Sequence, residues 1–133
     1  MKTYSSKFFA QKIKRLSLEM IFNSQSSHIG SCLSIADLIA VLYNDILFFD
    51  PKNASLKERD RFILSKGHAC AALYAALAVK GFFNINELSK FAQLNSKLMS
   101  HASHKVCGVE FSTGSLGHGL PFAVGKALSS KLK

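Results

Sequence analysis

The sequence predicts one small α/β domain over residues 1–133, rich in helix and with one or two strands. Three observations lead to this prediction. The chain has 133 residues, 48% of them hydrophobic, so it is long and apolar enough for one core but is no disordered chain. Several segments repeat apolar residues at helical spacing. One short apolar segment precedes a small-residue helix, and this strand–loop–helix order is typical of a parallel sheet.

Apolar residues three and four positions apart predict the first helix. Phe9, Ile13, Leu16 and Met20 fall on one face of a helix over about residues 6–23. A polar stretch follows and ends at a glycine, which indicates a turn.

The second helix is expected to begin with Ser34 as its N-cap. Apolar residues at helical spacing then continue to about Asn44. The Asp50–Pro51 pair breaks the pattern, and the charged residues 52–60 resemble a loop.

The best strand candidate is Arg61–Ser65, which is short, apolar in its middle and closed by Lys66–Gly67. A small-residue helix is expected from about His68 to Lys80, with Gly81 as its C-terminal stop. Its alanines favour close packing against a neighbour.

The remainder of the chain alternates short helices and loops. Asn84 can cap a short helix that ends near Phe91, and residues 97–112 lack any regular pattern. A glycine-rich loop then leads into a helix from Leu120 to Lys131, with Pro121 in the first turn, where proline is tolerated. The sequence ends where the next strand of a parallel sheet is expected.

Composition and charge narrow the class of protein. The chain carries 17 basic and 8 acidic residues, a formal net charge of +9. The lysines are scattered and no nucleic-acid recognition motif accompanies them, so a phosphate-bearing ligand explains the charge better than nucleic acid. Three cysteines without a CxxC motif indicate a reducing, cytoplasmic environment. The longest apolar run, Cys70–Val79, falls well short of the ~20 residues of a membrane helix.

Four of the five histidines lie beside glycine or serine in predicted loops or at helix starts: His28, His68, His101 and His118. A single histidine is more often structural than catalytic, but several in such turns favour a ligand site, because the backbone can approach a ligand there. Zinc is disfavoured, since His101 and His104 form the only closely spaced ligand pair. Cys70 lies two residues after His68, but on an apolar helix, which favours a buried small hydrophobe over a nucleophile.

A glycine-rich segment, Thr113–Pro121, runs directly into a predicted helix. Backbone amides of such a turn, together with a helix N-terminus, attract an anion. The spacing matches neither a Walker loop nor the dinucleotide GxGxxG motif, so the segment can equally be a tight turn before a helix.

Four motifs in order along the chain resemble the N-terminal part of transketolase. Ser27–Ser34 (SHIGSCLS) is similar to the family's first histidine turn. Asp60–Ala69 (DRFILSKGHA) is similar to its DRFxLSxGH segment and is the most distinctive stretch. His101 is similar to the histidine of its GHP turn, although serine and alanine replace the flanking glycine and proline. Residues 108–121 are similar to its GVExSTGSLGxGL signature.

The resemblance implies a partial thiamine-diphosphate-binding fold, in which helices cover both faces of a parallel sheet. It implies an enzyme that transfers a two-carbon ketol unit between sugar phosphates with thiamine diphosphate and Mg²⁺. His28 and His101 would then line the substrate channel, and His68 would lie near the diphosphate and the reacting centre. The cofactor contacts would also include these residues: Gly114, Ser115, Leu116 and His118.

Two parts of the family pattern are missing from the sequence: the metal-binding GDG motif and the glutamate that activates the cofactor. We therefore expect the chain to be inactive by itself, to contribute no metal ligand, and to need a complementary transketolase chain, a homodimer, or both. The alternatives are a non-catalytic truncated remnant or interaction module, and a part of a deoxyxylulose-phosphate-synthase-like enzyme.

Overall fold

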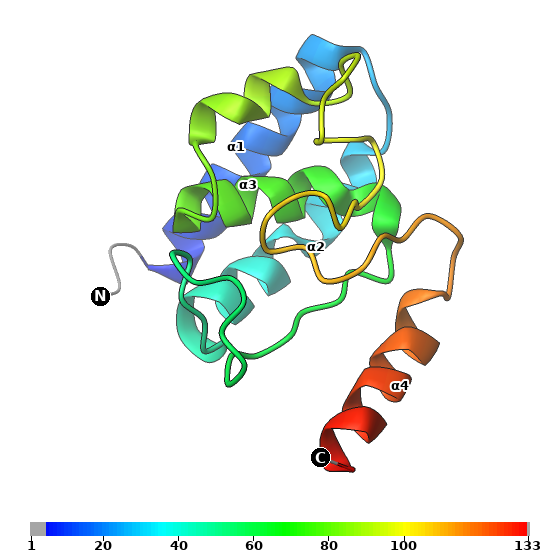
Figure 1. Ribbon diagram of the computed structural model, residues 1–133. Coiled ribbons are helices and arrows are strands. Elements are labelled where there is room, and N and C mark those ends of the chain that lie inside the picture. The colour runs from blue at the N-terminus through cyan, green and yellow to red at the C-terminus, as the bar shows by residue number, and fades with distance from the viewer. Residues whose placement is uncertain (1–4, 133) are drawn as a thin grey trace.

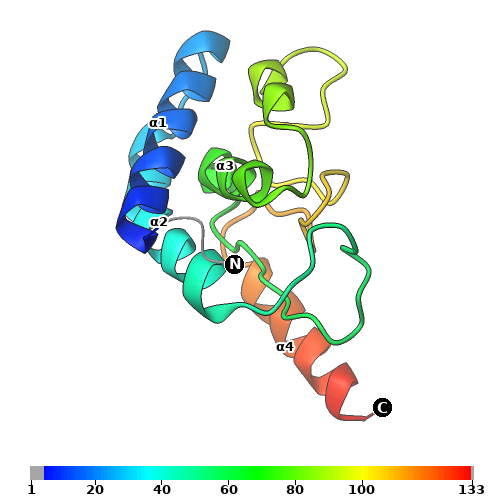
Figure 2. The same cartoon turned by 90° about the vertical axis from the view of Figure 1, so that its left-hand side faces the viewer.

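Three helices pack together at the centre of the molecule, and a fourth helix stands apart from them (Figures 1 and 2). The computed structural model describes residues 5–132. The packed helices are α1 (Ser6–Ser24), α2 (Ile29–Val41) and α3 (Cys70–Lys80), and the separate helix is α4 (Gly119–Lys131). The loops between residues 47 and 118 cover one side of this group.

The first helix confirms the periodicity of the sequence. The side chain of Ser5 caps α1 by accepting a hydrogen bond from the backbone N–H of Phe8 at 3.2 Å. Phe9, Ile13 and Met20 are buried, as their spacing predicts. Gln25 ends the helix in a left-handed conformation.

The second helix begins earlier than expected. It starts at Ile29, with His28 as its N-cap in a left-handed conformation (φ 78°), so the predicted N-cap Ser34 is wrong. The hydroxyl of Ser34 instead donates to the carbonyl of Ser31 inside the helix. The helix continues as a single π-helical turn over Leu42–Ile46, close to the predicted end.

The third helix is the centre of the core. Every residue from Cys70 to Ala78 is buried, because α1 and α2 both pack against this helix. Its small side chains let the neighbouring backbones approach closely, as the alanines of the sequence indicated. A 3₁₀ turn, Gly67–Ala69, leads into the helix, and Gly81 (φ 89°) ends it as predicted.

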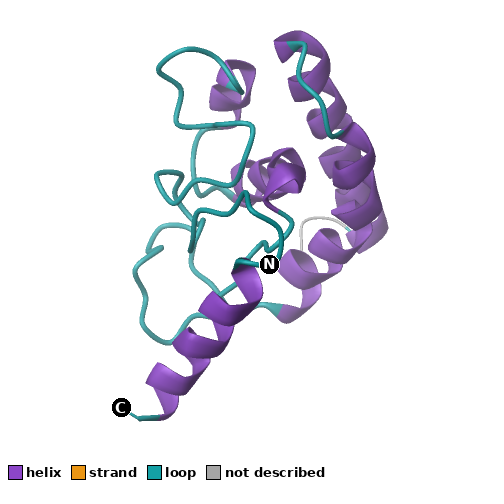
Figure 3. Ribbon diagram, turned by 90° about the vertical axis from the view of Figure 1, so that its right-hand side faces the viewer, coloured by secondary structure: helices purple, strands orange, loops and turns teal. Residues whose placement is uncertain are grey.

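The predicted strand at Arg61–Ser65 is wrong: the structure contains no strand within residues 5–132 (Figure 3). A strand requires a neighbouring backbone with which to exchange hydrogen bonds. Here the carbonyl of Leu64 accepts a hydrogen bond from the side chain of Thr113 instead. The prediction of one or two strands therefore fails for the described part of the chain, and the parallel sheet is not seen there.

The C-terminal half follows the prediction more closely. The side chain of Asn84 caps a 3₁₀ helix, Ile85–Lys90, by accepting from the backbone N–H of Asn86 at 2.9 Å. Residues 97–112 are irregular. The last helix begins at Gly119, one residue before the predicted start, and is fastened to the domain by stacking of Phe122 on Phe111, with ring centroids 3.8 Å apart.

One helical stretch of the described residues, Ile29–Ile46, is long and apolar enough to cross a membrane by composition. The same stretch packs against α1 and α3 in this fold. Length and composition are therefore weak indications of a membrane span here, because a core helix meets the same criteria.

Candidate functional site

Three of the predicted site histidines come together although they lie far apart in the sequence. The ring of His28 lies 5.2 Å from the ring of His68 and 5.8 Å from the ring of His101, measured between centroids. We call these three side chains the histidine cluster. Each of them retains contact with solvent, so the cluster is open to a ligand.

Three different elements supply the histidine cluster. His28 lies at the N-terminus of α2, and its Nδ1 is 3.2 Å from the hydroxyl of Ser27. His68 lies in the 3₁₀ turn before α3. His101 lies in the irregular segment that follows the 3₁₀ helix Ile85–Lys90. Packing of α2 on α3 therefore brings the first two histidines together.

The buried side chain of Tyr74 fixes the turn that carries His101. The Tyr74 hydroxyl donates to the carbonyl of His101 at 2.9 Å and accepts from the backbone N–H of Ser103 at 3.1 Å. Burial and the neighbouring Cys70 raise the pKa of Tyr74 well above its ordinary value, so the hydroxyl keeps its proton and remains a donor.

Backbone hydrogen bonds join the histidine turns to the glycine-rich segment. The N–H of Ala102 donates to the carbonyl of Gly67, and the N–H of Thr113 donates to the carbonyl of Ala102, both at 3.1 Å. The Thr113 hydroxyl donates to the carbonyl of Leu64 at 2.6 Å. A Cβ at Gly67 would lie 2.3 Å from the carbonyl oxygen of Thr113, so only glycine permits this approach.

The glycine-rich loop itself lies against the histidine cluster at one end. A Cβ at Gly114 would lie 3.5 Å from the ring of His101. At the other end of the loop, a Cβ at Gly119 would lie 2.5 Å from the Cα of Ser65. Ser65 precedes His68 by three residues. The loop is therefore held between two segments that carry the site.

The remaining predicted residues occupy the outer part of this loop. Ser115, Leu116 and His118 are exposed, and Gly117 has a φ of 90° that favours glycine. The backbone N–H of His118 donates to the carbonyl of Ser115 at 3.4 Å. Among the ring contacts that the described residues make, none joins His118 to the histidine cluster.

The segments that carry the site hold a lysine beside the histidines and lack the carboxylates that Mg²⁺ prefers. Partial burial, the nearby His28, Lys66 and His101 lower the pKa of His68, in that order of importance. The imidazole therefore stays neutral near pH 7. The segments that carry the site, residues 24–34, 65–69, 97–109 and 112–119, contain no acidic residue. The described part of the chain contains no cluster of three or more residues suited to hold a metal ion.

Cys70 and His104 lie near the site, and the contacts of both residues indicate structural roles. Cys70 is buried, its thiol lies 3.4 Å from the carbonyl of Met99, and burial followed by the nearby Cys32 raises its pKa to about 12. This agrees with a buried small side chain and disfavours a nucleophile. His104 lies outside the histidine cluster and contacts Ser112, with 2.7 Å between its Nδ1 and the Ser112 hydroxyl.

The sequence interpretation missed three residues that build the site. Tyr74 is the one polar aromatic residue in a helix that is otherwise apolar until Lys80, and that contrast could have indicated a buried hydrogen bond. Thr113 precedes the glycines, and a short side chain that reaches across to Leu64 has no signal in the sequence. Lys66 adjoins Gly67 and His68, and this placement of a cation could have indicated an anion site.

Comparison with known proteins gives the same assignment along the chain. A family model described as "Transketolase, thiamine diphosphate binding domain" matches residues 5–133. The transketolase of Buchnera aphidicola subsp. Acyrthosiphon pisum is 43% identical over 130 residues, which cover 96% of this chain and 20% of that protein. The 6-deoxy-6-sulfo-D-fructose transketolase subunit SqwG of Clostridium sp. is 43% identical over 124 residues, which cover 92% of this chain and 45% of that protein.

Solved structures share the fold. The transketolase of Pichia stipitis, in complex with sedoheptulose 7-phosphate, superposes with a TM-score of 0.88 at 36% identity and over 92% of this chain. The transketolase of Campylobacter jejuni superposes with a TM-score of 0.84 at 38% identity and over 90% of this chain. The chain spans 18% and 19% of these two proteins, respectively. The chain therefore belongs to the transketolase family and corresponds to part of its thiamine diphosphate binding domain.

Proposed function

We propose that this chain forms one wall of the active site of a transketolase-like enzyme, which transfers a two-carbon ketol unit between sugar phosphates. The observation that supports this most is the convergence of His28, His68 and His101 beside the glycine-rich loop. The motifs that carry these residues resemble those of the family in the same order, and the family match covers them.

The residues present fit the diphosphate end of thiamine diphosphate. The Gly114 position leaves open backbone against the His101 ring, and the nearby imidazoles offer hydrogen-bond donors without any competing carboxylate. They do not fit Mg²⁺, which prefers oxygen ligands such as carboxylates. We therefore infer that the family's metal would be held by residues outside this set.

In this proposal each histidine has a role that depends on its position in the site. His28 and His101, whose rings meet edge-on, would donate hydrogen bonds to sugar oxygens and move protons near neutral pH. His68 would contact the diphosphate and the reacting centre. The outer loop would hold the cofactor through its backbone and through these residues: Gly114, Ser115, Leu116 and His118. When bound, thiamine diphosphate supplies the carbanion chemistry, and the protein orients it.

A second polypeptide is part of the proposal. The chain spans 45% of SqwG and 44% of an apulose-4-phosphate transketolase component from Phocaeicola vulgatus, and the names of both relatives describe single subunits of a transketolase. We infer that a complementary chain supplies the metal ligands, that the complex can also contain a second copy of this chain, and that this chain is inactive by itself. A cytoplasmic location suits its three free thiols.

The test begins with the chain isolated gently from its own cells, in buffer with thiamine diphosphate and Mg²⁺. Native mass spectrometry gives the composition of the complex, and ketol transfer is assayed from a ketose phosphate to an aldose phosphate. We expect a complex that retains the cofactor and transfers the two-carbon unit. Turnover of pyruvate in place of a ketose phosphate would favour the deoxyxylulose-phosphate-synthase alternative.

The exposed face of α4 favours a second candidate, a non-catalytic interaction module. Leu120, Val124 and Leu128 recur every four residues along this helix and are exposed. A stable complex that binds no thiamine diphosphate and transfers no ketol unit would support that candidate and contradict the enzyme.

A further inference from the structure

The backbone of His28 has a conformation that its side chain makes unfavourable. Its φ is 78° and its ψ is 17°, in the left-handed region that the β-carbon of any residue other than glycine disfavours. The same residue begins α2, because its carbonyl accepts the N–H of Cys32 at 3.2 Å. Strained residues of this kind concentrate at functional sites, where the surrounding structure holds them in place. The strain at His28 therefore agrees with a role for its side chain.

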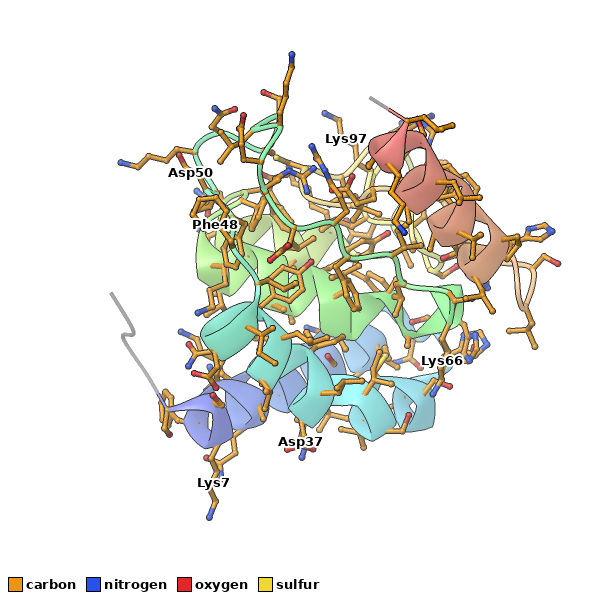
Figure 4. All side chains as sticks on the ribbon, turned by 90° about the horizontal axis from the view of Figure 1, so that it is seen from below. Lys7, Asp37, Phe48, Asp50, Lys66 and Lys97 are labelled. Carbon is orange, nitrogen blue, oxygen red and sulfur yellow. The ribbon has the colours of Figure 1, made fainter. Side chains whose placement is uncertain are left out.

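The surroundings of His28 place its ring. Both α2 and α3 start at the end of the molecule where Lys66 is labelled (Figure 4). The ammonium group of Lys66 donates to the hydroxyl of Ser34 on α2 at 2.7 Å, so the start of α2 is joined to the turn that carries His68. The rings of His28 and His68 consequently lie 5.2 Å apart. This frame places the imidazole of His28, but it does not determine which of the two nitrogens carries the proton.

The hydroxyl of Ser27 is the hydrogen-bond partner of the His28 ring. Its oxygen lies 3.2 Å from Nδ1. Among the described residues this is the one hydrogen bond of the Ser27 side chain and the one hydrogen bond of the His28 ring. Because the two nitrogens of an imidazole lie on different edges of the ring, a bond at Nδ1 leaves Nε2 available to a ligand.

Two arrangements of the protons fit this pair. The Ser27 hydroxyl can donate to an unprotonated Nδ1, which places the ring proton on Nε2. Alternatively it can accept from a protonated Nδ1, which leaves Nε2 without a proton. In the second arrangement the hydroxyl proton has no acceptor within residues 5–132. The proposed role of His28, donation of a hydrogen bond to a sugar oxygen, requires the first arrangement.

The contact distinguishes His28 from the other two histidines of the cluster. Within the described part of the chain, hydrogen bonds to an imidazole ring are made at His28 and at His104, which lies outside the cluster. Ser100 precedes His101 as Ser27 precedes His28, yet the hydrogen bond to the ring is made by Ser27 alone of these two serines. A serine before a histidine does not by itself produce the bond, so the local backbone at His28 is needed for it.

We propose that Ser27 is a positioning residue: its hydroxyl donates to Nδ1 of His28, so that Nε2 carries the proton and donates to the ligand. This inference rests on the proposed function and deepens it, because it assigns the nitrogen through which His28 would bind an oxygen of the sugar. A hydroxyl can donate or accept, so Ser27 would accept from Nδ1 whenever the ring becomes protonated. It thereby suits a histidine that also moves protons.

The experiment determines the position of the proton without turnover. The full chain, in its complex where one is isolated, is labelled with ¹⁵N at histidine. The nitrogen chemical shifts of each ring are measured by NMR well above its own titration midpoint, where they distinguish the nitrogen that carries the proton from the one that does not. The variants are Ser27→Ala, Ser27→Thr and the matched control Ser100→Ala. The ring of His104, outside the cluster, is the internal reference.

We expect the form with the proton on Nε2 of His28 to predominate in the unmodified chain. Ser27→Ala should lower the ratio of the two forms about two- to tenfold, as loss of one hydrogen bond does. Ser27→Thr should restore the ratio, because threonine keeps the hydroxyl, and Ser100→Ala should leave it unchanged. In a complex that transfers a ketol unit, Ser27→Ala should lower kcat/KM by a similar factor, and Ser27→Thr should recover it.

Three results would overturn the proposal: a predominant proton on Nδ1 of His28 in the unmodified chain, an unchanged ratio in Ser27→Ala, or an equal change in Ser100→Ala. The last result would show a general effect of removing a hydroxyl near the site. If the unmodified complex transfers no ketol unit although Ser27→Ala changes the ratio, the proposed function is contradicted, whereas the control of this proton by Ser27 stands.

Discussion

The hydroxyl of Tyr74 donates a hydrogen bond to the backbone carbonyl of His101 across 2.9 Å. It also accepts a bond from the backbone N–H of the buried Ser103. A side chain in the centre of the core therefore determines where a site histidine lies.

We predict that Tyr74→Phe destabilises the domain by about 1–3 kcal/mol, because the N–H of Ser103 is left buried without a partner. The free energy of unfolding is measured by urea denaturation. Tyr43→Phe is the matched control: Tyr43 is buried against Phe49 and Phe62, and its hydroxyl makes no hydrogen bond to another described residue. Equal stability of the two variants would contradict the role of Tyr74.

His68 and His104 should differ sharply in a completed complex. We expect His68→Ala to lower the rate of ketol transfer by about two orders of magnitude or more, because a proton-transfer or electrostatic role is lost. His104→Ala should change the rate little, since this side chain contacts Ser112 and lies outside the histidine cluster. Steady-state kinetics measures both. Unchanged turnover in His68→Ala would remove this residue from the mechanism.

The close approach of Gly67 to Thr113 predicts a steric effect. A methyl group at residue 67 would lie 2.3 Å from a backbone oxygen that is itself fixed, so Gly67→Ala should destabilise the fold by about 1–3 kcal/mol. Gly125→Ala is the control within α4, where no atom lies within 4 Å of the added carbon. That change should stabilise by up to about 1 kcal/mol. Thermal unfolding of both variants tests the contrast.

Glu110 forms ion pairs with two arginines near the start of the signature segment, residues 108–121. Its carboxylate faces Arg59 and Arg61, and its side chain is 12% exposed. Glu110→Gln should cost about 3 kcal/mol, because two partly buried cations lose their counter-charge. Glu19→Gln is the control at an exposed pair with Arg15, and it should cost less than about 0.5 kcal/mol. The free energy of unfolding of each variant is measured by denaturant titration. A similar loss in Glu110→Gln and Glu19→Gln would contradict the assignment of Glu110 to a more buried ion pair.

The three thiols should react at very different rates. Cys32 and Cys70 are buried and Cys107 is exposed. With its pKa raised to about 12, Cys70 carries only about one part in ten thousand of thiolate at pH 8. We expect one thiol per folded chain to react with a disulfide reagent at pH 8, and none in Cys107→Ser. Reaction of all three thiols in urea serves as the positive control; rapid labelling of Cys107→Ser in buffer would disprove the burial of the others.

Helices were predictable because their signals are local. The spacing of Phe9, Ile13 and Met20 and the stop at Gly81 depend on neighbours within a few residues. The strand at Arg61–Ser65 was mispredicted for the opposite reason. A strand exists only where a second strand pairs with it, and no such partner lies in the described residues.

The sequence predicted which histidines form the site, but it did not predict the hydrogen bonds that position them. The motif order identified His28, His68 and His101, and the structure brings these three together. The bonds that position them join residues such as Lys66 and Ser34, 32 positions apart. Neither the hydropathy pattern nor the local spacing of residues predicts a contact between residues so far apart in the sequence.

The hydrogen bond from Thr113 to Leu64 spans 49 residues, whereas those of α1 each span one helical turn. Closing a long loop costs entropy before any contact repays it, so such bonds form late in folding. The backbone amides of Ala102 and Thr113 should gain protection from hydrogen exchange after those of α1 and α3. His101 thus joins His28 and His68 late in assembly, and a newly made chain acquires its helices before it acquires its complete site.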